Sequence, residues 1–304
     1  MKLQEVGTEG LRARMRDGGV TLRLSPFTVR VRSDIPHLAA DVAAMYRDFE
    51  LATDEAFVDF HVAVLRSPHW LSRLQGRAEF WFDGQRSFTP LPAAQALAML
   101  EWGINWCIAA HAHQFLLIHA AVLERDGRAL LMPAPPGSGK STLCAALAHR
   151  GWRLLSDELG LLDLRTGLVH GMARPINLKN ASIPLIRSFA PEAVFSASMP
   201  NTSKGTVALV RAPQDAIDAR LAPARPAWVV LPAWRADAPA QLLPIERARA
   251  FMDLAEQSFN YDVHGQAGFQ ALGRLVGACD CFRFEYSRLD EALAHFDRLS
   301  ETAP

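Results

Sequence analysis

The sequence predicts an α/β fold, a mixed sheet with flanking helices, preceded by a small α+β domain. Strand-like and helix-like patterns alternate along most of its 304 residues, and one strand-to-helix junction contains the glycine-rich segment 134–142. Half of the residues are hydrophobic and 21% are charged, as is ordinary for a globular protein. We expect residues 1–110 to form the α+β domain, a structural or substrate-selecting appendage, and residues 111–304 to form the domain with the glycine-rich segment.

The amino-terminal region has the patterns of a small mixed sheet. Apolar and charged residues alternate over 20–32, which predicts two strands separated at Ser25-Pro26. Asp83-Gly84 between two apolar segments is a type I′ turn signal, which predicts a hairpin over 78–88. A long helix should follow over 93–110, because apolar residues recur at helical spacing and would bury one face. We expect this helix to be the hinge between the two domains. The remaining expected elements are a helix over 36–49 and a strand over 57–65.

The segment Ala134 to Thr142 has the pattern of a phosphate-binding loop between a strand and a helix. Gly137 and Gly139 let successive backbone amides turn toward one anion, and the start of the helix adds the positive end of its dipole. The first glycine of the usual pattern is Ala134 here, and an ordinary turn would explain the glycines but not the lysine and hydroxyls that follow. We therefore expect a nucleotide site made of Gly137, Ser138, Gly139, Lys140, Ser141 and Thr142, with Lys140 reaching the outer phosphates and Ser141 binding magnesium.

The elements around this loop are predicted from apolar runs and turn residues. Strands are expected over 115–123, 129–132, 152–155, 206–210, 226–232 and 281–286, with a hairpin over 159–164 and 168–170. Helices are expected over 143–149, 246–257, 265–278 and 289–299.

Two acidic residues, Asp157 and Glu158, follow the predicted strand 152–155. At the end of a strand beside a phosphate loop, carboxylates are placed to hold magnesium or to accept a proton from an attacking hydroxyl. A solvated turn is the alternative interpretation of this pair.

Two polar segments farther along the chain, 174–180 and 201–205, are expected to be irregular. Each is either a solvated turn or a clamp for phosphate or substrate. The candidate clamp residues are Arg174, Asn177, Lys179 and Lys204.

Charge and composition exclude some classes of partner. Lys+Arg and Asp+Glu are equal at 32, so no overall basic field favours nucleic acid or an anionic membrane. The sequence has no apolar run of bilayer length and no signal-peptide pattern, so we expect no membrane partner and a cytoplasmic location. The four cysteines lack zinc-site spacing, which predicts buried reduced thiols.

Residues 119 to 158 resemble the catalytic core of the HPr kinase/phosphorylase family. That family has a histidine before the phosphate loop, a loop ending in Gly-x-Gly-Lys-Ser, then Arg-Gly and a strand that closes with two acidic residues. Here His119 stands 21 residues before Lys140, Arg150-Gly151 follows the predicted helix, and Asp157 stands 17 residues after Lys140. The chain is most similar to the HPr kinase-related kinases, whose substrates need not be HPr.

The resemblance implies a P-loop kinase core that transfers the γ-phosphate of ATP to a hydroxyl of a peptide, protein or small molecule. Lys140 and Ser141 would bind phosphates and Mg²⁺, with help from Glu158. Asp157 would be the base that accepts the hydroxyl proton, and His119 would support the γ-phosphate or that base. The alternative is a nucleotide-binding ATPase or switch that regulates a partner and has no phosphate acceptor. The sequence leaves open the acceptor, reverse phosphorolysis and assembly into homo-oligomers, which the resembled family forms.

Overall fold

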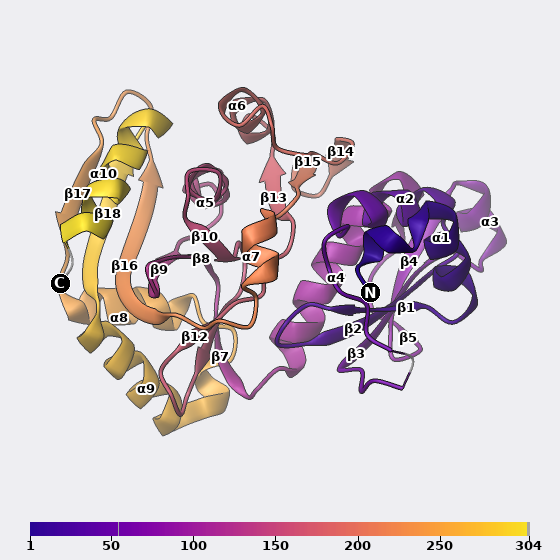
Figure 1. Cartoon of the computed structure of the whole chain (residues 1–304), viewed down its shortest axis with the longest axis horizontal. Helices are drawn as coiled ribbons and strands as arrows, with labels where there is room; N and C mark the ends of the chain where they lie inside the picture. Colours follow the sequence, from indigo (N-terminus) through magenta and orange to yellow (C-terminus); the bar gives the residue numbers. More distant parts are fainter. Residues whose placement is uncertain (54, 303–304) are drawn as a thin grey trace.

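A computed structural model describes residues 1–53 and 55–302 as a mixed α/β structure with several sheets and flanking helices (Figure 1). In this part of the chain the strands form four sheets. These features agree with the α/β class that the sequence predicts. No helix within the described ranges is long and apolar enough to cross a membrane.

The amino-terminal sheet has the strand order β1-β2-β3-β4-β5, with β6 paired to β4. Strands β2 and β3 are parallel, and the other neighbours are antiparallel. Asp83 and Gly84, between β4 and β5, both have the positive φ that a type I′ turn requires (46° and 77°). The strand pair expected over 20–32 (β1 and β2), the helix expected from residue 36 (α2) and the hairpin expected over 78–88 (β4 and β5) are therefore confirmed. The elements of this part are η1 (Leu3–Glu5), α1 (Gly7–Asp17), β1 (Val20–Arg23), β2 (Thr28–Ser33), α2 (Pro36–Met45), β3 (Phe60–Arg66), α3 (Trp70–Leu74), β4 (Arg77–Phe82), β5 (Gln85–Arg86), β6 (Leu91–Pro92), η2 (Ala93–Gln95) and α4 (Ala96–His111).

The central sheet has the order β10-β8-β9-β16-β18-β17. Its inner strands β9, β16 and β18 are parallel to one another, whereas β8, β10 and β17 join by antiparallel pairing. The glycine-rich segment lies between β9 and α5. The elements of this unit are β8 (Ala120–Arg125), β9 (Arg128–Pro133), α5 (Lys140–Ala148), β10 (Arg153–Ser156), β16 (Arg225–Trp234), β17 (Gln241–Pro244), α8 (Arg247–Glu256), α9 (Tyr261–Ala278), β18 (Asp280–Tyr286) and α10 (Leu289–Thr302).

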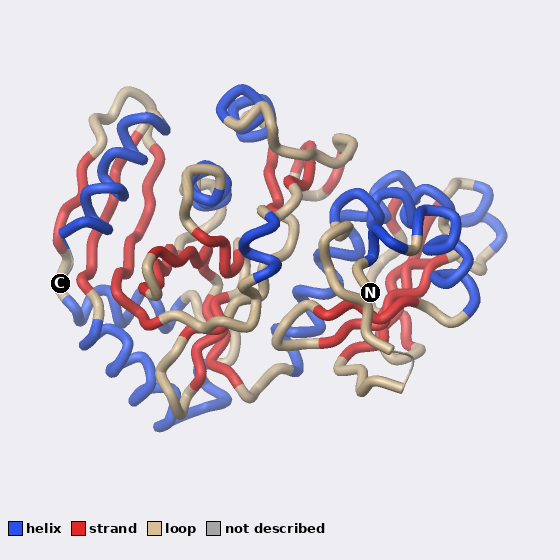
Figure 2. Tube along the Cα trace, in the orientation of Figure 1, coloured by secondary structure: helices blue, strands red, loops and turns tan. Residues whose placement is uncertain are grey.

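The two faces of the central sheet are covered by different helices (Figure 2). Side chains that alternate along β9 and β16, such as Leu130 and Val230, pack in one cluster with residues of α5 and α10. Their neighbours in sequence, such as Leu131 and Val229, pack in a second cluster with residues of α8 and α9. This alternation is what a strand buried on both faces produces.

Two three-stranded antiparallel sheets complete the structure, in the orders β12-β11-β7 and β13-β15-β14. In Figure 1, α5 lies between β16 on one side and β13 with α6 on the other. The elements are β7 (Phe115–Ile118), β11 (Gly160–Asp163), β12 (Val169–His170), β13 (Ile176–Lys179), α6 (Ser182–Phe189), β14 (Met199–Thr202), β15 (Gly205–Val210) and α7 (Gln214–Asp218).

Two sequence predictions about strands are wrong. The single strand expected over 115–123 is two strands, β7 and β8, which pair in different sheets and are separated at His119. The segment 174–180, expected to be irregular, contains β13, because Ile176 and Leu178 are buried and pair with Val210 and Ala208 of β15.

One buried apolar cluster contains residues from both parts of the chain, from Leu3 and Leu11 to Phe296 and Leu299. The four cysteines are all buried and free, as the sequence predicts.

Candidate functional site

The candidate site lies where the parallel strands of the central sheet end. The segment 134–139 leaves β9 at the same edge at which β16 ends at Trp234 and β18 ends at Tyr286, two residues that are direct partners in the sheet register. Ligands of open α/β sheets bind outside the carboxyl ends of parallel strands. The topology therefore brings three distant segments to one edge.

Gly137 and Gly139 have φ values of 90° and 87°, in the left-handed region that favours glycine. A Cβ on Gly139 would also clash with the hydroxyl of Tyr286, whereas a Cβ on Gly137 would meet nothing. The Tyr286 hydroxyl donates a hydrogen bond of 3.1 Å to the backbone carbonyl of Gly139. This position thus requires glycine both for its backbone and for the close approach of β18.

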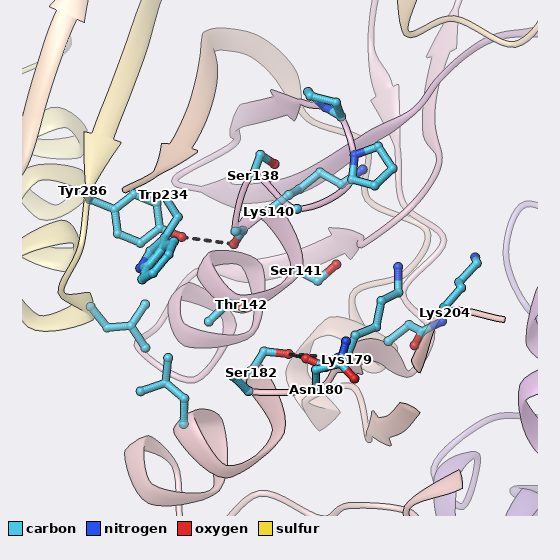
Figure 3. A pocket seen from close by; sticks show the side chains of 18 of the residues that line it. Ser138, Lys140, Ser141, Thr142, Lys179, Asn180, Ser182, Lys204, Trp234 and Tyr286 are labelled. Carbon is cyan, nitrogen blue, oxygen red and sulfur yellow. Dashed lines mark hydrogen bonds between the residues drawn. The ribbon is translucent and has the colours of Figure 1, made fainter. Parts of the chain in front are cut away.

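A pocket with about 610 Å³ of space for water lies over this loop (Figure 3). Its size is in the range of sites for cofactors and drug-sized ligands. The chain has only four lysines, and three of them, Lys140, Lys179 and Lys204, line this pocket. The side chains that line this pocket therefore include three ammonium groups.

Lys140 is the first residue of α5, and its side chain is buried. Its Nζ has no hydrogen-bond partner among the described residues, and neither has Ser138 Oγ. Burial lowers the pKa of Lys140, while the nearby charges of Glu158 and Asp157 oppose this shift. A buried ammonium without a hydrogen bond is costly, so this position favours an anionic ligand.

Asp157 follows β10 and is buried beside Lys140. One carboxylate oxygen, Oδ2, accepts a 3.1 Å hydrogen bond from the backbone N–H of Asn177 in β13. Burial, and then the charge of Glu158, raise the pKa of Asp157 to about 6, although Lys140, this amide and the Ser141 hydroxyl all act to lower it.

Glu158 forms a pair with His119, whose Nε2 lies 3.2 Å from the carboxylate. Burial alone would raise the pKa of Glu158, but the hydrogen bond with His119 and the charges of Lys140, His119 and Lys179 outweigh it and lower the pKa to about 2. The backbone N–H of His119 donates to the Gln257 carbonyl at 2.6 Å, which holds the residue at the break between β7 and β8. The pKa values of Asp157 and Glu158 are therefore shifted in opposite directions: that of Asp157 is raised and that of Glu158 is lowered.

The opposite wall of the pocket is formed by the end of β13, the start of α6 and the β14–β15 turn. In Figure 3, Lys179 and Lys204 lie on the side away from Trp234 and Tyr286. The Lys204 ammonium lies 4.9 Å from the ring centre of Trp102 in α4, and burial and the charge of Lys179 lower its pKa. Gln95 donates to the carbonyls of Pro200 and Asn201, which ties this turn to the amino-terminal part.

Comparison with known proteins gives a match over part of the chain. A family model described as "ScmC: SynChlorMet cassette protein ScmC" matches residues 93–177, less than a third of the chain. The matched segment extends from the start of η2 through the glycine-rich loop and the acidic pair to Asn177. Comparison with curated proteins finds no match.

A solved structure, the Hpr(Ser) kinase/phosphatase from Coxiella burnetii, is similar to this chain with a TM-score of 0.28 and 14% sequence identity. The similarity covers 62% of this chain and 99% of that chain.

The structure brings most of the predicted site residues together. The pocket is lined by His119, Gly137, Ser138, Gly139, Lys140, Ser141, Thr142, Glu158, Asn177, Lys179 and Lys204. Asp157 does not line this pocket; it is buried next to Lys140 and Asn177. Arg174 lies apart from the pocket: it is buried in an ion pair with Glu101 of α4.

Sequence reasoning missed the apolar wall of the pocket, made by Leu185, Trp234, Tyr286 and Leu289. Trp234 and Tyr286 come from strands and lie 95 and 147 residues beyond Gly139 in sequence, and the apolar pattern of these strands is the same as that of ordinary buried strands. Only the parallel pairing of β9, β16 and β18 shows that they share an edge. No local signal could have found them.

The oxygen donors of this site fit Mg²⁺. No group of three or more His, Cys, Asp or Glu side chains that could hold a metal occurs in residues 1–53 and 55–302. Magnesium in phosphate-transfer sites needs no such group, since it is bound by one or two carboxylates, water and phosphate oxygens. Ser141, Asp157 and Glu158 supply the protein oxygens for that arrangement.

Proposed function

We propose that this protein is an ATP-dependent kinase that transfers the γ-phosphate of ATP to a hydroxyl, with the segment 134–142 as its phosphate-binding loop. The main support is Lys140, a buried ammonium that lacks a hydrogen-bond partner in the described chain and faces a pocket beside two carboxylates. An oligophosphate would supply the missing acceptors.

The phosphates would lie over the amides of the loop at the start of α5, where the helix dipole favours an anion. Lys140 would bind the outer phosphates from below, and Lys179 and Lys204 would neutralise charge from the opposite wall. Trp234, Leu185 and Leu289 offer an apolar surface on which a nucleobase could stack. Pocket volume and charge are both suited to a nucleoside triphosphate.

Ser141, with Asp157 and Glu158, would hold Mg²⁺, which neutralises charge on the phosphate oxygens when bound. The charge of Glu158 is secured by His119, since their pairing keeps the glutamate ionised. Because phosphoryl transfer depends mostly on positioning and charge neutralisation, these groups suffice to bind and orient the phosphoryl donor.

Asp157 would be the general base for the acceptor hydroxyl. Its pKa is raised toward neutrality by burial and by Glu158, so that the group is ionised at pH 7 yet is a stronger base than an exposed aspartate. The backbone amide of Asn177 fixes one of its oxygens.

Replacement of Lys140 by methionine tests this proposal, and Lys2→Met is a matched control, because Lys2 is the one lysine outside the pocket and pairs with Asp218 on the surface. We expect Lys140→Met to weaken binding of a fluorescent ATP analogue with Mg²⁺ by roughly 10- to 100-fold, the size of a lost charge-assisted hydrogen bond. The control should bind as the wild type does.

Incubation of the purified protein with γ-labelled ATP and an extract of its own cell should label a hydroxyl-bearing species. Equal ATP affinity in both variants would contradict the nucleotide site. Release of ADP without any labelled acceptor would favour an ATPase or switch instead.

A further inference from the structure

A buried polar cluster connects the amino-terminal part of the chain to β13, the strand whose Asn177 amide donates a hydrogen bond to Asp157. Arg174, just before β13, donates from Nη1 to Glu101 of α4 at 3.1 Å and from Nη2 to Asn105 of the same helix. Glu101 also accepts a hydrogen bond from the hydroxyl of Tyr46, at the end of α2. The side chains of Arg174 and Glu101 are only 6% and 4% exposed.

These contacts use both terminal nitrogens of Arg174 but leave Nε. Three polar atoms here are buried without a hydrogen-bond partner in the described part of the chain: Arg174 Nε, Asp157 Oδ1 and Asn177 Oδ1. Buried polar atoms nearly always have a hydrogen-bond partner, so three unpartnered polar atoms on neighbouring side chains need an explanation.

The three residues line one small cavity, with Glu101 and Asn105 on its amino-terminal side. The space in it open to the centre of a water molecule is about 10 Å³, which is close to the minimum that one water requires. The cavity is thus too small for a substrate or for a hydrated ion.

The chemistry of the three atoms identifies the occupant. Arg174 Nε–H is a donor, whereas Asp157 Oδ1 and Asn177 Oδ1 are acceptors. One water molecule can accept one hydrogen bond from the arginine and donate one to each oxygen, which satisfies all three groups. A metal cation does not fit, because a donor N–H and a guanidinium charge face it.

We propose that this cavity holds one ordered water, through which Arg174 positions the Asp157 carboxylate, and that Tyr46 and Glu101 of the amino-terminal part complete the site by holding Arg174. This inference rests on the proposed function only in naming Asp157 as the base. With Oδ2 bound to the Asn177 amide and Oδ1 bound to this water, the carboxylate has both oxygens fixed.

The same geometry gives residues 1–110 a role in the chemistry. Arg174 is fixed by two side chains of α4, 73 and 69 residues earlier in sequence. Arg174 is therefore a positioning residue rather than a substrate clamp, and the amino-terminal part supplies its support.

A crystal structure of the full-length, nucleotide-free protein at a resolution that shows ordered water tests the first step, and it needs no activity or acceptor. We expect a water within hydrogen-bond distance of Arg174 Nε, Asp157 Oδ1 and Asn177 Oδ1. An empty cavity, or a direct hydrogen bond between Arg174 and Asp157, would overturn the proposal.

The positioning role is tested by Arg174→Lys, which keeps the charge but removes the Nε–H. Its matched control is Arg153→Lys, because Arg153 of β10 is likewise in a largely buried pair, with Glu124, and donates to the carbonyls of Ala219 and Ala222, away from Asp157. We expect Arg174→Lys to slow single-turnover phosphoryl transfer roughly 10-fold or more, as for a misplaced reacting group, with affinity for Mg²⁺-ATP within about twofold of wild type.

An unchanged transfer rate in Arg174→Lys, or an equal fall in the control, would contradict this role. Should the wild-type protein transfer no phosphate at all, the proposed function fails, while the crystallographic result still decides the water site.

Discussion

The hydroxyl of Tyr286, at the end of β18, donates a hydrogen bond to the carbonyl of Gly139 in the glycine-rich loop, 147 residues earlier in sequence. The two residues are so close that any Cβ at position 139 would meet this hydroxyl first. The conformation of the loop is therefore set by the sheet edge as well as by its own sequence.

This relationship predicts coupling between the two positions. Gly139→Ala should destabilise the protein by roughly 1–3 kcal/mol, because its φ of 87° is strained for alanine and the new methyl group displaces Tyr286. Addition of Tyr286→Phe should recover part of this loss, since it removes the nearest clashing atom. Denaturant unfolding of both single variants and the double variant would measure the coupling, which we expect to exceed about 0.5 kcal/mol; strictly additive effects would contradict the contact.

The pKa of Asp157 predicts the acid limb of the activity profile. Asp157 must be ionised to act as the proposed base, and its pKa is raised to about 6, so kcat/KM should fall tenfold per pH unit as the pH drops below about 6 and be level above it. Glu158→Gln removes a charge that raises this pKa, so its acid limb should move to lower pH. An acid limb that stays in place in Glu158→Gln would show that another group controls the profile.

The raised pKa of Asp157 also predicts how stability depends on pH: low pH should lower activity, but it should favour folding through this group. Since the pKa of Asp157 is higher in the folded than in the unfolded state, this group favours folding at pH below the unfolded value near 3.8, and that contribution is lost as the pH rises through about 6. Asp157→Asn should therefore raise Tm at pH 8 more than at pH 4. Thermal unfolding followed by circular dichroism at both pH values would check it; a lower Tm at pH 8 would contradict the buried charge.

The shared apolar cluster predicts cooperative unfolding. The proposed nucleotide site lies in residues 111–304. However, one buried cluster contains side chains from Leu3 to Leu299, and the Arg174–Glu101 pair also joins residues 1–110 to residues 111–304. We expect a single denaturant transition, coincident by tryptophan fluorescence and circular dichroism. Two separate transitions, one of them shifted by Mg²⁺-ATP, would show that the two parts fold independently.

Local sequence was enough to predict the loop, the acidic pair and most strands around them. The requirements of a glycine with positive φ, a lysine and a hydroxyl act within nine residues, so their pattern is visible in the sequence. The division of 115–123 into β7 and β8 could not be predicted, because nearly all of these residues are buried and the apolar run has no period that indicates a break.

The rest of the site depends on contacts between distant residues. Trp234 and Tyr286 reach the pocket only through the strand order of the central sheet. Arg174 is held away from the pocket by Glu101, which lies beside it in space but 73 residues earlier in sequence. Neither residue type nor spacing carries that information in a single sequence.

The central claim is that Asp157 acts in the chemical step of a kinase. The most direct measurement is Asp157→Asn, with Mg²⁺-ATP affinity and single-turnover transfer to the labelled acceptor recorded on the same sample. Asp163→Asn is the control, because the Asp163 carboxylate, at the end of β11, accepts hydrogen bonds from the backbone N–H groups of Arg165 and Thr166. We expect affinity near that of wild type and transfer slowed by roughly 10²- to 10⁴-fold, as for loss of a positioned base. Wild-type rates of transfer in Asp157→Asn would contradict the assignment.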